Sequence, residues 1–185
     1  MMNLREAIYS RRAVRDFTIE AMDEGTLKEL IDAAIQAPSA VNQQPWRFTV
    51  LRDQKVLAEI SRQSKAHMLR TSPAALASPH FNAILNNPDF NIFYHAPALI
   101  VISAPDGPWI VEDCALAAEN LMLAACAAGL GTCWIGFAQG WLASREGKSM
   151  LKLADSVVPV APIIVGHPKR GTAAVPRQPA VIDWL

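Results

Sequence analysis

The chain has 185 residues, of which 51% are hydrophobic, 18% charged and 7% aromatic. A chain of this length and composition builds one core, so we expect a single domain over residues 1–185 and exclude a disordered, collagen-like or coiled-coil protein. Seventeen Lys and Arg residues balance seventeen Asp and Glu residues. A formal net charge of zero provides no general field toward nucleic acid or an anionic membrane, so any anion site must be a local cluster.

The N-terminus has no apolar stretch of the kind that forms a secretory signal. Arg5 and Glu6 introduce charges at once, and Arg11 and Arg12 follow closely. The least charged stretch, after Glu119, is interrupted by polar residues and glycines, which predicts protein core and not a membrane span. We therefore expect a cytoplasmic protein that binds neither nucleic acid nor a membrane.

Three cysteines, Cys114, Cys126 and Cys133, stand in apolar surroundings without the spacing of metal ligands. Their odd number argues against a disulfide framework and predicts buried, unreactive thiols. The four histidines are scattered, and no HExxH pattern occurs. The sequence therefore predicts no metal site.

The first half of the chain predicts three helices and one strand. A short helix follows Asn3, a longer one follows Asp23, and a third follows Asp53, because each of these residues can cap a helix N-terminus. The second helix carries apolar side chains at helical spacing, namely Leu27, Leu30, Ile31, Ala34 and Ile35, and ends before Pro38. Residues 47–51 predict a strand, whereas residues 64–94 contain three prolines and show no sustained period.

The second half predicts a long central helix between buried strands. Residues 98–103 form a β-branched run that is typical of a strand covered on both faces. Residues 111–128 are almost all small or apolar and predict a central helix that Gly129 ends. The elements that follow are a strand over residues 131–137, a helix from the cap Ser144 to residue 153, and a strand over residues 160–165. This alternation predicts an α+β fold, in the form of an α/β sandwich.

A basic cluster follows the first helix. Arg11, Arg12 and Arg15 are close together in sequence, and a guanidinium group can bind a phosphate through two hydrogen bonds. A local anion site is one interpretation of this cluster. The other, which is more common for short basic runs, is solvated surface or salt-bridge partners.

The loop over residues 38–46 is rich in small and amide side chains. Ser39, Asn42, Gln43 and Gln44 both donate and accept hydrogen bonds, as recognition of a polyol or a heterocycle edge requires. The alternative is that these groups only cap and satisfy a turn. The same string also contains the pair Pro45-Trp46, which makes it more specific than an ordinary turn.

Four segments together resemble the nitroreductase family of FMN-dependent oxidoreductases, and they occur in that family's order. They are residues 10–17 (SRRAVRDF), 37–46 (APSAVNQQPW), 128–137 (AGLGTCWIGF) and 164–168 (IVGHP), the last followed by the tail. The resemblance implies a mixed central sheet flanked by helices, and an FMN bound at the interface of a homodimer. The tail over residues 169–185 ends in apolar side chains, so we expect it to pack on other protein, such as the second subunit.

The resemblance also implies which residues bind the cofactor. The FMN phosphate and the nearby flavin edge fall to Arg11, Arg12, Ala13 and Arg15, with Arg177 joining from the tail. The flavin contacts from the partner subunit fall to Pro38, Ser39, Ala40, Asn42 and Gln44. The ring near its N5 atom is lined by Trp134, Ile135 and Gly136, where a glycine allows close approach. Ala13 stands where many relatives have serine, so one hydroxyl contact is absent.

The implied activity is that of an FMN-dependent NAD(P)H oxidoreductase. NADH or NADPH delivers hydride to flavin N5 and leaves, and a nitroaromatic, quinone or related acceptor is then reduced in the same pocket by ping-pong kinetics. The sequence has no Ser-His-Asp or Cys-His arrangement and no GxGxxG motif, so no catalytic side chain is predicted and the nicotinamide should bind transiently over the flavin.

Three alternatives remain open at this point. The first is an FMN-dependent oxidase or dehydrogenase of the same superfamily, and the second is a non-catalytic flavin-binding protein. The third is that the arginines are solvated and the amides only cap, which predicts a colourless protein that does not bind FMN.

Overall fold

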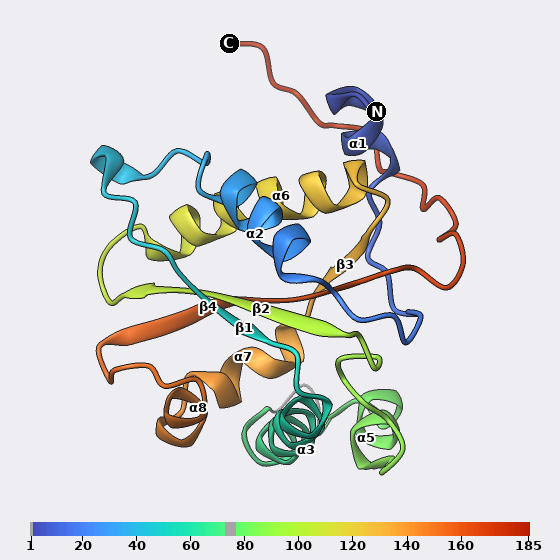
Figure 1. The fold of residues 1–185 in the computed structure, drawn as a ribbon, viewed down its shortest axis with the longest axis vertical. Coiled ribbons are helices and arrows are strands. Elements are labelled where there is room, and N and C mark those ends of the chain that lie inside the picture. Colours follow the sequence, from blue (N-terminus) through green and yellow to red (C-terminus); the bar gives the residue numbers. More distant parts are fainter. Residues whose placement is uncertain (1, 73–76) are drawn as a thin grey trace.

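A four-stranded sheet between two layers of helices forms the centre of the computed structural model, which describes residues 2–72 and 77–185 (Figure 1). The strands are β1 (Arg47–Leu51), β2 (Ala98–Pro105), β3 (Gly131–Trp134) and β4 (Val157–Gly166), in the spatial order β1-β2-β4-β3. Their three pairings are all antiparallel. The predicted α+β sandwich is thereby confirmed.

The two faces of the sheet carry different helices (Figure 1). One layer consists of α1 (Leu4–Ser10), α2 (Glu24–Ala34) and α6 (Ile110–Ala127), and the other of α3 (Gln54–Thr71), α5 (Pro79–Asn86), α7 (Gly136–Leu142) and α8 (Arg145–Met150). Successive residues of β2 alternate between the layers, because Ile100 and Ile102 belong to the core beneath α6 while Leu99 and Val101 belong to the opposite core. This double coverage confirms the predicted strand and explains its continuous apolar sequence.

The sheet has one parallel element beyond its strands. Ala13 forms an isolated parallel bridge with Thr132 of β3, so the chain after α1 runs beside the edge of the sheet. The four strands themselves pair only antiparallel, so among the residues described this isolated bridge is the one parallel contact where a mixed sheet was expected.

Side-chain caps begin the helices where the sequence predicts them. Asn3 forms a capping box with Glu6, with both hydrogen bonds at 2.9 Å. Asp23 accepts from the Thr26 amide at 2.8 Å, and Asp53 accepts from the Lys55 amide at 2.8 Å. These bonds satisfy amide groups that a helix start otherwise leaves free, which is why local sequence alone locates these helices.

The predicted boundary after β3 is wrong. The predicted strand over residues 131–137 ends at Trp134, and α7 begins at Gly136. The Ile135 amide donates to the Pro162 carbonyl at 2.8 Å and Ala138 then donates back to Ile135, so the chain turns into a helix. A short apolar run does not by itself distinguish a strand from a buried helix.

The stretch without a visible period, residues 64–94, contains the end of α3 and all of α5. Ser61, Ser64 and Lys65 occupy buried positions of α3, so polar side chains stand where the helical pattern calls for apolar ones. This substitution hides the period. Residues 73–76 of this stretch lie outside the described residues.

The long apolar helix forms as α6, and Gly129 with φ of 75° follows its end. One side of α6 packs on the sheet, whereas Val111 and Leu116 on the other side are 59% and 46% exposed. The side away from the sheet is therefore open in a single chain. No helix in the described part of the chain combines the length and the apolar character needed to cross a membrane.

The cysteines are free, with Cys114 and Cys133 buried and Cys126 partly exposed. Cys126 departs from the predicted burial because it lies in the last turn of α6, where its sulfur is 3.5 Å from the Ser10 hydroxyl. No group of three or more His, Cys, Asp or Glu side chains suited to a metal ion occurs among the described residues.

Candidate functional site

The first part of the site is the basic segment, residues 11–15, which lies against β3. The Val14 amide donates to the Thr132 carbonyl at 2.9 Å. A Cβ atom on Gly131 would lie 2.8 Å from the Val14 side chain, which is closer than two carbon atoms can approach. The glycine therefore allows two segments that are more than 100 residues apart in sequence to lie in contact.

Arg12 is held in place by its own backbone surroundings. Its Nη1 atom donates to the Tyr9 carbonyl at 2.8 Å and to the Arg11 carbonyl at 2.7 Å. Its Nε atom is buried and has no hydrogen-bond partner among the described residues. Arg11 forms an ion pair with Glu119 of α6, with 3.4 Å between Nε and Oε1. A buried donor without an acceptor is unusual and fits an anion oxygen at this place.

Arg15 shares a pocket with the segment that follows β3. Its Cζ atom lies 5.9 Å from the centre of the Tyr94 ring. The pocket measures about 190 Å³ and is lined by Arg15, Ile92, Tyr94, Cys133, Trp134, Ile135, Gly136 and Phe137. The structure thus brings Arg15 together with Trp134, Ile135 and Gly136, as the resemblance implies for the two sides of one cofactor site.

The polar groups of this pocket other than Arg15 favour their neutral forms. Burial raises the pKa of the Cys133 thiol, and the positive charge of Arg15 only partly offsets this effect. Burial likewise raises the pKa of the Tyr94 hydroxyl against the influence of the same arginine. Arg15 is therefore the charged side chain of a pocket whose remaining walls are neutral or apolar.

Two further hollows adjoin the basic segment. One, of about 210 Å³, includes Arg11 and Arg12, and the other, of about 290 Å³, includes Ala13 and Arg15. Arg170 lines both hollows, and its Nε atom is 2.9 Å from Oδ2 of Asp16. The tail therefore starts at the basic segment and places a fourth arginine there.

Gly136 is not required by the packing of the chain itself. A Cβ atom built there would meet only Oε1 of Gln139, at an ordinary contact distance of 3.7 Å. The space beside this glycine is consistent with the predicted close approach of a ligand, although simple helix geometry would also accept a glycine.

The second predicted part of the site is the amide loop, residues 38–46, which contains the 3₁₀ turn η1 (Ala40–Asn42). The Ala40 amide donates to Oδ1 of Asp113 in the first turn of α6 at 2.9 Å. Inside the loop, the Gln44 amide donates to the Ser39 hydroxyl and the Gln44 side chain donates to Asn42, both at 2.9 Å.

The amide loop and the basic segment lie at opposite ends of α6 (Figure 1). The loop is bonded to Asp113, whereas Ser10, just before the basic segment, contacts Cys126 in the last turn. Thirteen residues of helix separate these two positions, which is roughly 20 Å. One chain therefore does not bring Pro38, Ser39, Ala40, Asn42 and Gln44 to the arginines. Arg177 lies in the exposed tail and has no hydrogen bond or ion pair with the described part of the chain.

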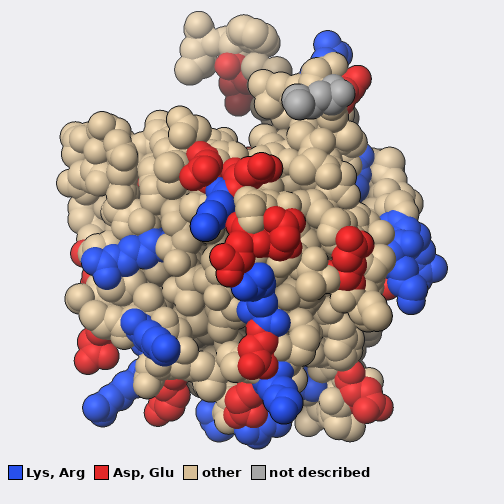
Figure 2. Space-filling view, viewed as in Figure 1, with Lys and Arg blue, Asp and Glu red and all other residues tan. Residues whose placement is uncertain are grey.

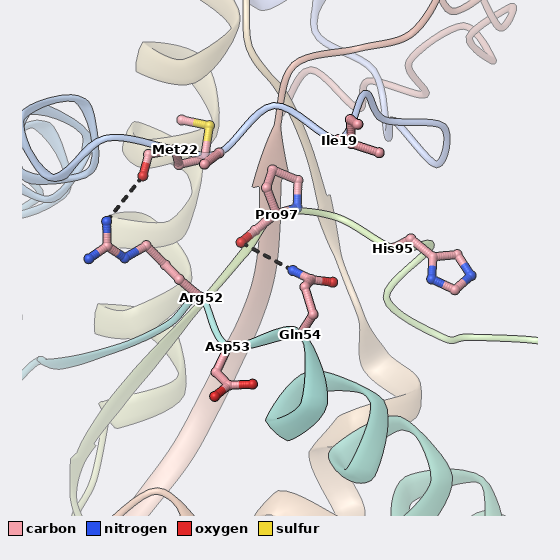
Figure 3. Close-up of a pocket in the computed structure, with 8 residues that line it drawn as sticks. Ile19, Met22, Arg52, Asp53, Gln54, His95 and Pro97 are labelled. Carbon is pink, nitrogen blue, oxygen red and sulfur yellow. Dashed lines mark hydrogen bonds between the residues drawn. The ribbon is translucent and has the colours of Figure 1, made fainter.

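A larger cavity lies elsewhere, where β1 leads into α3. It measures about 740 Å³ and is lined by Ile19, Ala21, Met22, Arg52, Asp53, Gln54, His95 and Pro97 (Figure 3). Arg52 donates to the Met22 carbonyl at 3.2 Å, Gln54 donates to the Pro97 carbonyl at 3.4 Å, and Asp53 caps α3. Since these polar groups serve the fold, we place the candidate site at the smaller hollows beside the arginines.

Sequence reasoning missed two residues of the site, Tyr94 and Arg170. Tyr94 ends the stretch without a visible period, and its backbone has φ of 52°. No local sequence pattern predicts this conformation. Arg170 forms a basic pair with Lys169 directly after β4, and this pair was the signal available in the sequence.

Charge on one face of the molecule does not compete with this cluster. On the face shown in Figure 2, acidic and basic side chains are interleaved, in keeping with the net charge of zero. This face offers no large area of one sign, which leaves a local cluster as the means of attracting an anion.

Comparison with known proteins finds a family match over most of the chain. The family model described as "Nitroreductase family" matches residues 8–167. A similar protein is the "Putative NADH dehydrogenase/NAD(P)H nitroreductase" of Archaeoglobus fulgidus, 28% identical over 163 residues, which covers 88% of this chain and 83% of the relative.

Solved structures show the same fold. The nitroreductase with bound FMN from Desulfitobacterium hafniense is 26% identical, with a TM-score of 0.81 and coverage of 100% of both chains. The nitroreductase with bound FMN from Bacteroides fragilis reaches a TM-score of 0.85 at 23% identity, again over 100% of both chains. The sandwich, the order of the four motifs and the match over residues 8–167 lead to one conclusion, that this chain belongs to the nitroreductase family.

Proposed function

We propose that the protein is an FMN-dependent oxidoreductase that uses NADH or NADPH to reduce nitroaromatic, quinone or related acceptors. The observation that carries this proposal is the meeting of the basic segment with residues 133–136 at the pocket beside Arg15. The Archaeoglobus relative with NAD(P)H nitroreductase in its name, and the FMN-bound Desulfitobacterium structure, support it.

The residues around the basic segment fit an FMN. A phosphate dianion requires local positive charge and hydrogen-bond donors. The buried Nε of Arg12 is such a donor, because it has no partner in the described structure. A flat, largely apolar ring requires neutral walls, which the pocket at Trp134 and Ile135 provides. We assign the phosphate and nearby flavin edge to Arg11, Arg12, Ala13 and Arg15, with Arg177, and the ring to Trp134, Ile135 and Gly136.

Bound FMN supplies the redox chemistry, because its ring accepts hydride from a nicotinamide and passes electrons to a second substrate. The chain binds and orients the reactants. Tyr94 and Cys133 keep their protons at neutral pH, since burial raises the pKa of each, and they neither bring charge nor act as bases there. The Arg15 cation favours electron-rich ligand atoms in the pocket.

We further infer that the protein acts as a homodimer. Several apolar side chains that one chain leaves exposed lie on α1 and α6, namely Leu4 (70%), Tyr9 (69%), Val111 (59%) and Leu116 (46%). Trp184 in the tail is 89% exposed. Apolar surface of this extent is expected to be covered by another chain.

The dimer also accounts for the distant amide loop. Because the loop and the basic segment lie at opposite ends of α6, a second subunit is the simplest source of Pro38, Ser39, Ala40, Asn42 and Gln44 for the flavin. FMN then lies between the subunits, and binding the cofactor and forming the dimer become coupled.

The first test is the visible absorbance of the purified protein, followed by NADH or NADPH without oxygen. We expect a yellow protein that bleaches and then recovers its colour with a nitroaromatic or quinone. Parallel lines in double-reciprocal plots would support ping-pong kinetics. A yellow protein that neither nicotinamide bleaches would favour an oxidase or a flavin-binding protein, and a colourless protein with excess FMN would refute the proposal.

A further inference from the structure

Asp113 is a buried carboxylate near the start of α6. It is 3% exposed, and none of the ion pairs in the described part of the chain includes it. A carboxylate removed from water is unfavourable unless hydrogen-bond donors or a helix N-terminus compensate it. A buried carboxylate of this kind therefore calls for a role.

The donor that Asp113 accepts from belongs to the amide loop. The Ala40 amide lies 2.9 Å from Oδ1 of Asp113. The other hydrogen bonds of residues 39–44 stay within the loop, from Asn42 to the Ser39 carbonyl, from Gln43 to the Ala40 carbonyl, and from Gln44 to Ser39 and Asn42. In the described structure, the bond to Asp113 is thus the single hydrogen bond that joins these six residues to another element.

The loop that this bond holds has an unfavourable backbone. Val41, Asn42 and Gln44 have φ values of 45°, 57° and 49°. This left-handed region suits glycine and is costly for a β-branched residue such as Val41, which is also 88% exposed. Such a conformation persists only where the surroundings hold it.

We propose that Asp113 is a positioning residue that fixes the amide loop in the shape in which it contacts flavin. This inference rests on the proposed function, in which Ser39, Ala40, Asn42 and Gln44 contact the FMN bound to the second subunit. Asp113 acts through Ala40 and does not touch the cofactor itself. A loop ordered before binding loses less conformational freedom when FMN binds, so affinity rises.

The test compares D113A with D113N in the full chain, and E112A is the matched control because Glu112 is an exposed carboxylate in the same turn. Hydrogen exchange at residues 41–44 is measured without FMN, and the FMN dissociation constant by fluorescence titration. We expect D113A to raise both the exchange rate and the dissociation constant about tenfold or more. D113N retains an oxygen that accepts the Ala40 bond, so both values should stay within about threefold of the wild type, as in E112A.

A second variant, A40P, removes the same bond from its other side. Ser39 is extended, with φ of −138° and ψ of 157°, and Ala40 opens the 3₁₀ turn, so a proline fits there without its N–H. A40P should raise the exchange rate at residues 41–44 as D113A does, which keeps the test decisive if D113A does not fold. Exchange without FMN is the readout for this variant, because Ala40 is itself one of the proposed flavin contacts.

Three results would overturn the proposal. The first is an unchanged exchange rate in both D113A and A40P. The second is a higher exchange rate in D113A with an unchanged FMN dissociation constant. The third is a loss of FMN affinity in D113N equal to that in D113A, which would assign the effect to the charge of Asp113 and not to its hydrogen bond. If the wild type binds no FMN, the proposed function fails, and the exchange comparison on FMN-free protein still decides whether Asp113 fixes the loop.

Discussion

Arg15 is exposed at the pocket, and its charge faces the Tyr94 ring and the Cys133 thiol. We predict that R15A weakens FMN binding about tenfold or more, because a hydrogen bond between charged groups is lost, while the thermal midpoint changes little. R145A is the matched control, since Arg145 is an exposed arginine on α8. Equal FMN affinity in R15A and the wild type, measured by titration, would remove Arg15 from the site.

Cys114 predicts a pH dependence of stability. Burial, helped by the neighbouring Asp113 charge, raises the pKa of this thiol from 9.0 to about 12. Between these values the unfolded chain releases the thiol proton while the folded chain retains it, so the free energy of unfolding falls as the pH rises, by at most about 1.4 kcal/mol per pH unit. Below pH 9 this contribution is constant.

C114A should lack this part of the decrease, and urea denaturation from pH 8 to pH 11 measures it. C126A serves as the control because that thiol is partly exposed. If the wild type and C114A lose stability in parallel across this range, the folded protein does not hold the Cys114 proton more tightly than the unfolded chain.

Among the elements, the contact between the basic segment and β3 depends on Gly131, which has no side chain. A Cβ atom on Gly131 would lie 2.8 Å from Val14. G131A should therefore push residues 11–15 away from β3, destabilise the fold by about 1–3 kcal/mol and weaken FMN binding at the same time. Denaturant unfolding and FMN titration are measured together. G107A is the control, because a Cβ there meets only Cγ2 of Ile110, at an ordinary contact distance of 3.9 Å. An equal, small effect of both variants would contradict the close contact.

The elements themselves show which local signals suffice. Asn3, Asp23, Asp53 and Ser144 each cap the helix that the sequence predicts, because a cap acts within three residues of the helix start. The boundary after β3 could not be predicted in this way. Its turn depends on the bond from Ile135 to Pro162, a partner on another strand.

In the molecule as a whole, the tail is a further part that a single chain leaves uncovered, besides α1 and the outer side of α6. Residues 171–185 are exposed throughout, although they include Val181 and Trp184. A chain ending at Arg170 should dimerise more weakly and lose FMN, because the proposed subunit contacts of the tail and Arg177 are both removed while those of α1 and α6 remain. Sedimentation velocity and flavin absorbance check this prediction.

The full-length variant R177A separates the two effects of that truncation. It should remain dimeric and bind FMN about tenfold or more weakly, since only a phosphate contact is lost. A truncated chain that still forms a dimer with full FMN occupancy would show that the tail serves neither purpose.

The fold class, the helix starts and the four motifs can be predicted from the sequence alone, because propensity, capping and hydrophobic period depend on neighbouring residues. Which of the motif residues lie in contact depends on how the chain folds. Ala13 and Thr132 lie more than 100 residues apart and pair only through the layout of the sheet, which also places Arg15 beside Ile135 and leaves the amide loop at the far end of α6. Contacts between distant segments depend on register and packing, and no local pattern contains them.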